Sequence, residues 1–382
     1  MTVTNPDLPL SAADVERTCL PLEQATMLPG AAYTDYAVFQ WERANFFRQG
    51  WICVGHIEQV ASRGQFLTLD AGGENVLVVG DDDGLPRAFL NTCRHRGARL
   101  VIQPAGTLRR IQCPYHAWTY GFDGSLKNAP FTDGLVDFDP KCFSLHEIRL
   151  AVVEGLVLLD LSGEAPPPQA HIGDLAPMLA RYRNAELRRG ARIVYDVDAN
   201  WKAIGENYSE CLHCPGVHPE LNRLSHYLSG ETIEGAGLWC GGSMTLAEGV
   251  ETMATDGGHG RKPIEGVDVR SILYFLIFPN TLVSLHPDYV MLHTLWPKSP
   301  GRTEVVCEWF FEPEAVSSPD FDPTDAVEFW DQVNREDWEV CALTQRGMGS
   351  PSFTPGRYTT QEGDVHAFDT MVAERYLEAL NV

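Results

Sequence analysis

Two short pairs of cysteine and histidine constrain this chain more than any other feature of its sequence. The first pair is Cys93 and His95, with one residue between them. The second pair is Cys113 and His116, with two residues between them, and seventeen residues separate the pairs. Thiolate and imidazole groups are common metal ligands in proteins. The pairs therefore predict one metal centre held by two cysteines and two histidines.

Two kinds of metal centre use this set of ligands. A Rieske [2Fe–2S] cluster has two cysteine ligands on one iron and two histidine ligands on the other. A structural zinc ion can bind the same set, but zinc fingers place two cysteines close together and the two histidines after them. In this chain each pair contains one residue of each type, beside a turn-forming glycine or proline. This order favours a Rieske cluster bound by Cys93, His95, Cys113 and His116.

A second group of possible ligands lies in residues 200–220, NWKAIGENYSECLHCPGVHPE. His213 and His218 are five residues apart, about 140° around a continuous helix, which is too far to share a metal. The Pro-Gly pair between them predicts a break that turns His218 back towards His213. Two imidazoles and one carboxylate form the facial triad of non-haem iron(II) oxygenases. The alternative is a closed zinc site built with Cys211 and Cys214 in addition.

The carboxylate of the triad is expected on the helix predicted from Thr324 to about Arg346. At 100° per residue, apolar residues of this helix lie within about 60° of Asp337, whereas Glu336 and Glu339 lie about 100° or more away. A carboxylate on an apolar stripe is costly to bury without a partner, and a metal ion is one such partner. Asp337 is therefore the predicted third ligand. The alternative is a buried aspartate paired with an arginine or a cap.

The segments around these sites predict an α+β chain with two main domains. Residues 64–91 contain three strand candidates separated by turn-forming residues, which is typical of a small antiparallel β domain. Residues 162–170, SGEAPPPQA, indicate a linker. We expect an N-terminal helical segment (1–47) packing with the catalytic domain, a Rieske domain (48–162) and a catalytic domain (163–382).

Composition argues against several classes of partner and location. The chain has 29 basic and 52 acidic residues, and a net charge of −23 does not favour nucleic acid or an anionic membrane surface. The N-terminus has no signal-peptide pattern, and no stretch predicts a membrane span. Ten cysteines without secretory features indicate a reducing compartment, where clustered cysteines are expected to bind metals rather than form disulfides. We expect a cytoplasmic protein.

Both metal motifs resemble those of one family. CRHRGARL followed by CPYHAWTYGFDGSL is similar to the cluster-binding signature of Rieske non-haem iron oxygenase α subunits, also called the aromatic-ring-hydroxylating dioxygenase family. REDWEVC resembles the family's helix that carries the carboxylate ligand. The resemblance, from about residue 35 to the end, implies an antiparallel Rieske domain and a helix-grip-like catalytic domain with a mononuclear Fe(II). It also implies O2 as co-substrate, a separate NAD(P)H reductase with flavin and an iron–sulfur centre, and a homotrimer.

Glu210 occupies a position with a special role in this family. It precedes His213 by three residues, so both are expected on one helix face. The resemblance implies that Glu210 carries electrons between subunits by linking His116 of one subunit to His213 of the next. Many aromatic-ring dioxygenases have aspartate here, and the glutamate resembles the glycine betaine demethylase and carnitine oxygenase branch. The alternative is a solvated helix glutamate.

The substrate pocket is expected within residues 272–296 by family analogy. Aromatic faces attract trimethylammonium groups, but they also stack on aromatic rings or fill a core. FPNTLVSLHPDYVMLHTLWP resembles the glycine betaine demethylase type, which favours oxidative N-demethylation of a betaine or other quaternary ammonium compound. His286 and His293 are expected to form hydrogen bonds in the core or pocket rather than bind metal. The five aromatic residues expected in the pocket are Trp239, Phe275, Phe278, Tyr289 and Trp296.

Three other functions remain open from the sequence, among them a zinc-stabilised binding or scaffolding protein. One is ring hydroxylation or O-demethylation of an aromatic acid by the same kind of oxygenase. Another is a Rieske electron-transfer protein without oxygenase activity, which would need no mononuclear iron in addition to the cluster.

Overall fold

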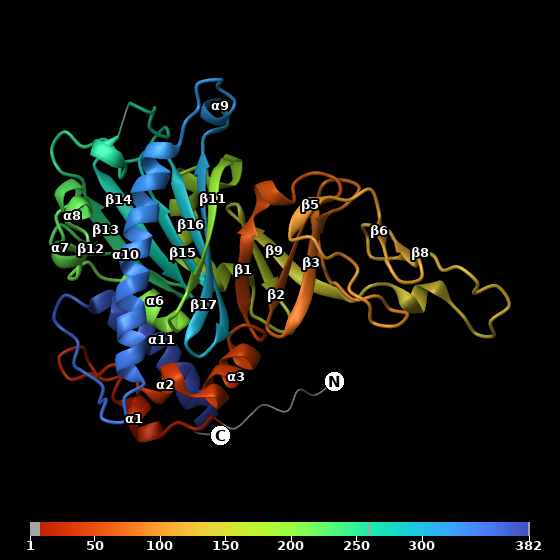
Figure 1. The fold of residues 1–382 in the computed structure, drawn as a ribbon, viewed down its shortest axis with the longest axis horizontal. Helices are drawn as coiled ribbons and strands as arrows, with labels where there is room; N and C mark the ends of the chain where they lie inside the picture. Colours follow the sequence, from red (N-terminus) through yellow and green to blue (C-terminus); the bar gives the residue numbers. More distant parts are fainter. Residues whose placement is uncertain (1–7, 259, 381–382) are drawn as a thin grey trace. The chain divides into compact units, whose positions relative to one another are not determined.

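The computed structural model describes residues 8–258 and 260–380, which form two compact units (Figure 1). The smaller unit is residues 43–168, and the larger unit combines the chain up to Glu42 with the chain from Gln169 onward. Each unit contains a seven-stranded sheet, and every strand pairing is antiparallel. The predicted α+β class is confirmed.

The smaller unit contains a seven-stranded and a three-stranded sheet. The three strands predicted over residues 64–91 are present, with turns between them at residues 72–73 and 81–85. The order across the larger sheet is β1 (Trp51–His56), β10 (Leu156–Asp160), β9 (Glu147–Val153), β4 (Pro86–Leu90), β3 (Glu74–Gly80), β2 (Gln65–Ala71) and β5 (Ala105–Thr107). The smaller sheet is β6 (Ile111–Gln112), β7 (Thr119–Tyr120) and β8 (Leu126–Asn128).

The sheet of the larger unit is a meander with one strand out of sequence order, because β11 pairs with the last strand of the unit. Its strands β14 to β17 are largely buried, in keeping with their branched and aromatic residues. The order across the sheet is β11 (Arg188–Val197), β17 (Arg302–Phe311), β16 (Val290–Ser299), β15 (Thr281–Leu285), β14 (Ser271–Ile277), β13 (Trp239–Thr245) and β12 (Glu231–Thr232).

Three helices of this unit position the candidate site. Helix α6 (Trp201–Tyr208) contacts both α10 (Thr324–Met348) and α11 (Gly363–Leu380), and each of the three also contacts the sheet. Figure 1 shows α10 as the long blue helix running along one face of the sheet. The other α-helices are short: α1 (Ala12–Glu16), α2 (Ala31–Thr34), α3 (Tyr36–Asn45), α4 (Pro168–Ile172), α5 (Ala176–Arg181), α7 (Cys214–Val217), α8 (Pro219–Leu224) and α9 (Pro313–Val316).

A buried ion pair fixes the start of α6. The side chain of Asn200 caps the helix by accepting the backbone N–H of Lys202. Lys202 Nζ lies 2.5 Å from Glu42 Oε1, and both side chains are almost completely buried. Removing one partner of such a pair leaves an uncompensated buried charge, at a cost of about 3–5 kcal/mol. The pair therefore holds α6 against the N-terminal helices.

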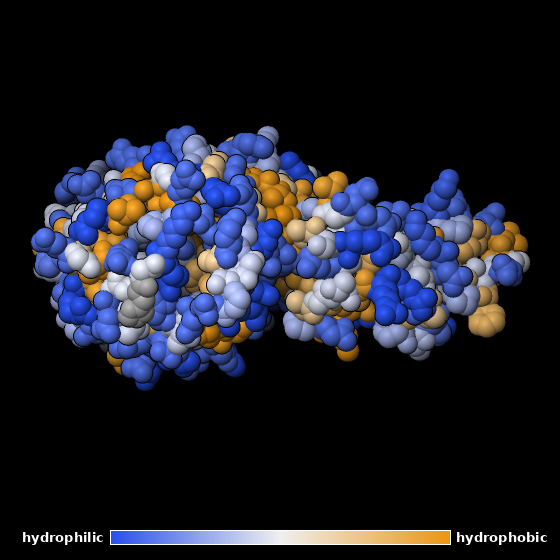
Figure 2. Space-filling view, turned by 90° about the horizontal axis from the view of Figure 1, so that it is seen from above, coloured by the Kyte–Doolittle hydropathy of each residue, from blue (hydrophilic) through white to orange (hydrophobic). Residues whose placement is uncertain are grey.

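The face of the molecule in Figure 2 is mostly hydrophilic, with apolar residues in smaller patches. This agrees with the high content of acidic residues. In the part of the chain that the structure describes, the helices are all too short or too polar to cross a membrane.

Candidate metal centres and their cavity

The two predicted cluster loops have the same backbone arrangement. Cys93 and Cys113 each donate the backbone N–H to the carbonyl five residues later, at 2.8 Å. The residues four positions after them, Gly97 and Ala117, are left-handed, with φ of 71° and 57°, and donate back to the cysteine carbonyls. A left-handed residue lets the chain turn sharply. Each cysteine therefore occupies the equivalent position of an equivalent loop.

The four predicted cluster ligands lie as a cysteine pair and a histidine pair. Cys93 and Cys113 are both buried, and their thiol groups are within hydrogen-bond reach of each other. The ring centroids of His95 and His116 are 4.8 Å apart. Burial raises the pKa of Cys113, while the backbone N–H groups of His116 and Tyr115 act in the opposite direction because they stabilise its thiolate.

These residues fit a [2Fe–2S] cluster. Nδ1 of His116 is buried and has no hydrogen-bond partner among the described residues. A buried nitrogen without a partner is costly, and an iron ion would satisfy it. The indole of Trp118 stacks on His95 at 4.8 Å with an angle of 4°, which holds that ring in place. Two sulfurs beside two imidazoles are the donor set of a Rieske centre.

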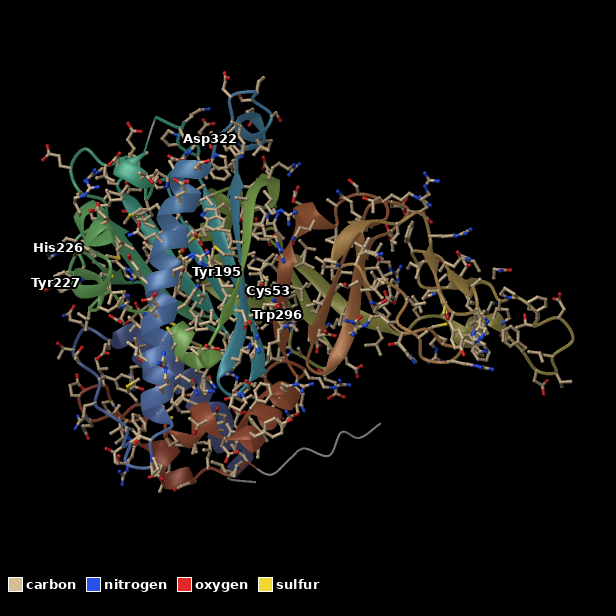
Figure 3. The ribbon with its side chains drawn as sticks, in the orientation of Figure 1. Cys53, Tyr195, His226, Tyr227, Trp296 and Asp322 are labelled. Atoms are coloured by element: carbon tan, nitrogen blue, oxygen red, sulfur yellow. A yellow bond between two sulfur atoms is a disulfide. The ribbon has the colours of Figure 1, made fainter. Side chains whose placement is uncertain are left out.

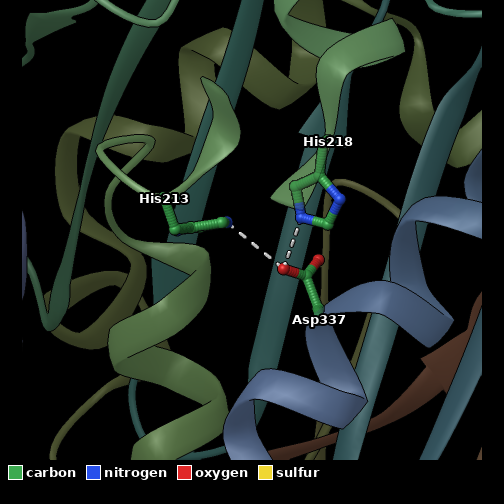
Figure 4. A group of neighbouring side chains, drawn as sticks. All are labelled: His213, His218 and Asp337. Atoms are coloured by element: carbon green, nitrogen blue, oxygen red, sulfur yellow. Dashed lines mark hydrogen bonds and ion pairs between the residues drawn. The ribbon is translucent and has the colours of Figure 1, made fainter. Parts of the chain in front are cut away.

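The structure brings together the three residues predicted to bind the second iron. One donor atom each from His213, His218 and Asp337 lie within 4.8 Å of one another (Figure 4). Asp337 Oδ1 is 3.2 Å from His213 Nε2 and 2.8 Å from His218 Nε2. Both imidazoles thus present Nε2 to the same carboxylate oxygen. Two nitrogens and one carboxylate on one side of a metal leave its other positions open.

His213 is held by a turn rather than by a helix, which corrects the sequence prediction. Helix α6 ends at Tyr208, so Glu210 and His213 do not share a helix face. The carboxylate of Glu210 instead accepts the backbone N–H groups of Leu212 and His213. Its Oε1 also lies 2.5 Å from Nδ1 of His213. One glutamate thus shapes the turn and orients the ring.

His218 follows the short helix α7 and precedes the proline of α8. The predicted break at the Pro-Gly pair is misplaced, because Pro215 and Gly216 lie inside α7. The break falls at His218 itself, where φ is −123° and ψ is 65°. A residue before proline is disfavoured in the helical conformation, and Pro219 follows. His213 and His218 therefore flank one helical turn and face each other.

Glu336 completes the support of the triad and was not predicted. Its Oε2 lies 2.6 Å from Nδ1 of His218, and Gln332 donates to its other oxygen at 2.9 Å. Histidine ligands commonly donate the second ring N–H to a carboxylate, which fixes the tautomer. The helical angle placed Glu336 away from Asp337, but its side chain is long enough to reach the ring. In the sequence, this role is indicated by two adjacent acids on the predicted helix, Glu336 and Asp337.

The electrostatics of the triad couple its three members. Burial lowers the pKa of His213, but the carboxylates of Asp337 and Glu210 outweigh this effect and raise it to about 9. Burial raises the pKa of Asp337, yet hydrogen bonds from His213 and His218 bring it below its usual value. The site is thus built to stabilise positive charge at the point where both Nε2 atoms meet Asp337.

Cys211 and Cys214 are joined by a disulfide. This corrects the expectation that clustered cysteines would be ligands rather than disulfides. It also removes both sulfurs from the alternative zinc site, since a disulfide offers no thiolate. The bond closes the short loop that contains His213.

A cavity of about 250 Å³ opens beside the triad. Four aromatic residues line it. Three of them form a connected set, Tyr208 from the end of α6, Tyr274 from β14 and Trp330 from α10, and the fourth is Tyr227. The ring centroids of Tyr208 and Tyr274 are 6.0 Å apart, and those of Tyr274 and Trp330 are 6.4 Å apart. In both pairs the two ring planes are steeply inclined to each other. The hydroxyl of Tyr208 is bonded to Ser284, and the indole N–H of Trp330 to Tyr289, so these polar groups are already used.

The five aromatic residues predicted for the pocket do not line this cavity, which corrects their assignment. Side chains alternate between the faces of a strand, so Tyr274 and Leu276 line the cavity while Phe275 between them points to the other face. Trp296 lies well apart from Tyr227, a cavity residue, in Figure 3. All five are buried and belong to the core: Trp239, Phe275, Phe278, Tyr289 and Trp296.

The two other predicted histidines are also core residues. His286 is completely buried and stacks on Tyr289, with ring centroids 4.2 Å apart. His293 is 2% exposed, and burial lowers its pKa to about 4. The ring nitrogens of both histidines have no hydrogen-bond partner among the described residues, which corrects the expectation that they form hydrogen bonds. Neither belongs to the group of possible metal ligands.

Comparison with known families matches both units of the chain. Residues 50–139 match the Rieske [2Fe–2S] domain, and residues 184–378 match the ring hydroxylating alpha subunit (catalytic domain). The first match contains all four predicted cluster ligands, and the second contains the whole triad.

Individual relatives and a solved structure agree with these matches. The chain is 30% identical to the glycine betaine monooxygenase oxygenase subunit of Pseudomonas aeruginosa PAO1, over 92% of this chain and 90% of that protein. It is 28% identical to the carnitine monooxygenase oxygenase subunit of Escherichia coli K12, over 88% of each. The quaternary ammonium Rieske monooxygenase CntA, in complex with an inhibitor, superposes with a TM-score of 0.83 at 25% identity, covering 96% of this chain and 99% of that chain.

Proposed function

Since the chain belongs to the family of Rieske ring-hydroxylating oxygenase α subunits, an oxidoreductase family, we propose that it oxidises a small quaternary ammonium compound. The proposed reaction is oxidative removal of an N-methyl group. The observation that carries this proposal is the set of three tilted aromatic rings in the cavity beside the triad, Tyr208, Tyr274 and Trp330. Such rings attract quaternary ammonium groups by cation–π interaction.

The matched domains imply a [2Fe–2S] cluster and a mononuclear iron. We assign the cluster to Cys93, His95, Cys113 and His116, and the iron to His213, His218 and Asp337. When bound, these groups supply one-electron transfer and the activation of O2. A separate NAD(P)H-dependent reductase is the proposed source of electrons.

The residues of the chain have three tasks in this reaction. The aromatic rings orient the ammonium group so that one N-methyl carbon faces the triad. Glu210 and Glu336 hold Nδ1 of the two ligand histidines, so that both present Nε2 inward. The walls of the cavity limit the access of water, which favours reaction with the substrate over unproductive reduction of oxygen.

The proposed reaction balances with two electrons and two protons. One oxygen atom of O2 enters a C–H bond of the N-methyl group, and the other leaves as water. The resulting N-hydroxymethyl compound breaks its C–N bond, releasing formaldehyde, a proton and the demethylated amine.

Glu210 is the proposed connection between subunits. It binds Nδ1 of His213 through Oε1 and is only partly exposed, at 15%. In a homotrimer its carboxylate would also accept a hydrogen bond from the cluster histidine of a neighbouring subunit, the equivalent of His116. Electrons would then pass from cluster to iron through one hydrogen-bonded carboxylate.

Product analysis with a panel of compounds tests the proposed function. The reconstituted protein, supplied with electrons by a surrogate reductase, should consume O2 and release formaldehyde with trimethylammonium compounds. Hydroxylation of an aromatic acid, with no reaction of any ammonium compound, would overturn the proposal.

A further inference from the structure

Acidic side chains are prominent on the wall of the cavity. Among the residues that the structure describes, four carboxylates line the cavity, and neither lysine nor arginine does. Two of the four, Glu210 and Asp337, interact with the ligand histidines. The other two, Glu231 and Asp364, are not part of the triad or its support.

Asp364 is the more enclosed of these two acids. It is the second residue of α11 and is partly buried, whereas Glu231 lies on the edge strand β12 and is exposed. Asp364 hydrogen-bonds Thr232 and acts electrostatically on Cys240, which also lines the cavity. Asp364 therefore lies beside β12 on the cavity wall.

The surroundings of Asp364 leave its charge without a balancing group. Neither Asp364 nor Glu231 forms an ion pair with a basic side chain in the described ranges, 8–258 and 260–380. An aspartate in the first turn of a helix is often there to interact with the helix dipole, which would lower its pKa. The pKa of Asp364 is instead raised by burial, against the hydrogen bond with Thr232. The carboxylate is thus partly desolvated without a compensating cation.

The aromatic rings and Asp364 border the same space. Tyr208, Asp364 and Cys240 of β13 all line the cavity, and Cys240 interacts electrostatically with both of the others. A positive charge in this space would meet aromatic faces and a carboxylate. A negative charge there would meet Asp364 and Glu231, and the described lining offers no lysine or arginine to bind it.

We propose that the substrate is a small organic cation without an anionic group, such as a quaternary ammonium alcohol, and that Asp364 determines this specificity. This inference rests on the proposed function, and it divides the quaternary ammonium compounds into two groups. Zwitterionic betaines carry a carboxylate that this wall repels. Cations of the same shape carry none.

Choline and glycine betaine form a matched pair of probes, since both carry a trimethylammonium group and differ in an alcohol against a carboxylate. Binding to the iron-loaded protein is measured by calorimetry, and kcat/KM is measured from product formation with a surrogate reductase. We expect choline to bind at least tenfold more tightly than glycine betaine and to show at least a tenfold higher kcat/KM. Asp364→Asn should weaken choline binding about tenfold or more and bring the two affinities closer together.

Asp320→Asn is the matched control, because Asp320 is exposed and does not line the cavity. It should leave both affinities unchanged. Glycine betaine binding as tightly as choline, or choline binding that Asp364→Asn leaves unchanged, overturns the inference and leaves the proposed function standing. Turnover of aromatic acids with no binding of either trimethylammonium probe overturns both.

Discussion

Glu336 offers a sharp test of how the triad is held, because it touches the iron site only through a ligand. Its Oε2 lies 2.6 Å from Nδ1 of His218, whose Nε2 faces Asp337 at 2.8 Å. Removing the carboxylate leaves all three proposed ligands in place but releases the ring of His218. Loss of such an outer partner typically weakens metal binding tenfold to a hundredfold. This corresponds to about 1.4–2.7 kcal/mol.

The structure separates two variants within this range. In Glu336→Gln the amide oxygen can still accept from His218, so only the charge is lost and we expect a loss of about tenfold. In Glu336→Ala no acceptor remains, and we expect a loss nearer a hundredfold. Anaerobic competition between the protein and a chelator for Fe(II) measures the affinity. The visible spectrum and EPR signal of the cluster report whether the other centre is intact.

Glu339→Gln serves as the control, since Glu339 is exposed on the same helix and makes no contact with the triad. It should bind Fe(II) like the unaltered protein. The reasoning is refuted if Glu336→Ala retains full affinity for Fe(II), or if Glu339→Gln loses as much affinity as Glu336→Gln.

Three further predictions follow from the same geometry. Asp337→Ala should lose the mononuclear iron and keep the cluster, lowering the iron content from about three to about two per chain; unchanged iron content would reject Asp337 as a ligand. Glu210→Ala should keep the cluster and, with Fe(II) supplied at saturation, the mononuclear iron, but lose product formation coupled to electron input, as single-turnover and iron assays would show; normal coupling would reject the bridge. Burial and the charge of Glu206 raise the pKa of Asp369, so the folded state binds protons more tightly than the unfolded state and stability falls as pH rises from about 4 through the raised pKa. The melting temperature of Asp369→Asn should therefore fall less between pH 5 and pH 9 than that of the unaltered protein; the same pH dependence in both proteins would contradict this.

Much of the architecture followed from periodicity and ligand chemistry. The three strands of residues 64–91 were predictable because apolar runs alternate there with glycine and aspartate turns. Helix α10 was predictable over nearly its whole length, and its apolar stripe favoured Asp337 over Glu336 and Glu339. The cysteine and histidine pairs predicted a Rieske domain, which the family comparison confirms.

Local geometry around the ligand histidines could not be predicted in the same way. Residues 209–213 have a sequence compatible with helix, but the carboxylate of Glu210 stabilises a turn by accepting two backbone N–H groups. A side chain competing with the helix for its own backbone leaves no mark in hydrophobic periodicity. Two cysteines three residues apart are equally compatible with metal binding and with the disulfide that the structure contains.

The prediction of the residues that line the cavity was wrong for a different reason. Strands β14 to β16 are largely buried on both faces, so alternation alone does not say which face the helices cover. A shift of one residue exchanges Tyr274 for Phe275 as a cavity residue. Only the packing of α6, α10 and α11 settles which face borders the triad.

Simultaneous measurement of O2 consumption and formaldehyde release decides whether this protein removes N-methyl groups. With reductant, a surrogate reductase and a quaternary ammonium compound, the iron-loaded protein should release about one formaldehyde for each O2 consumed, as the balanced reaction requires. Oxygen uptake without formaldehyde for every ammonium compound, together with hydroxylated product from an aromatic acid, would contradict the account.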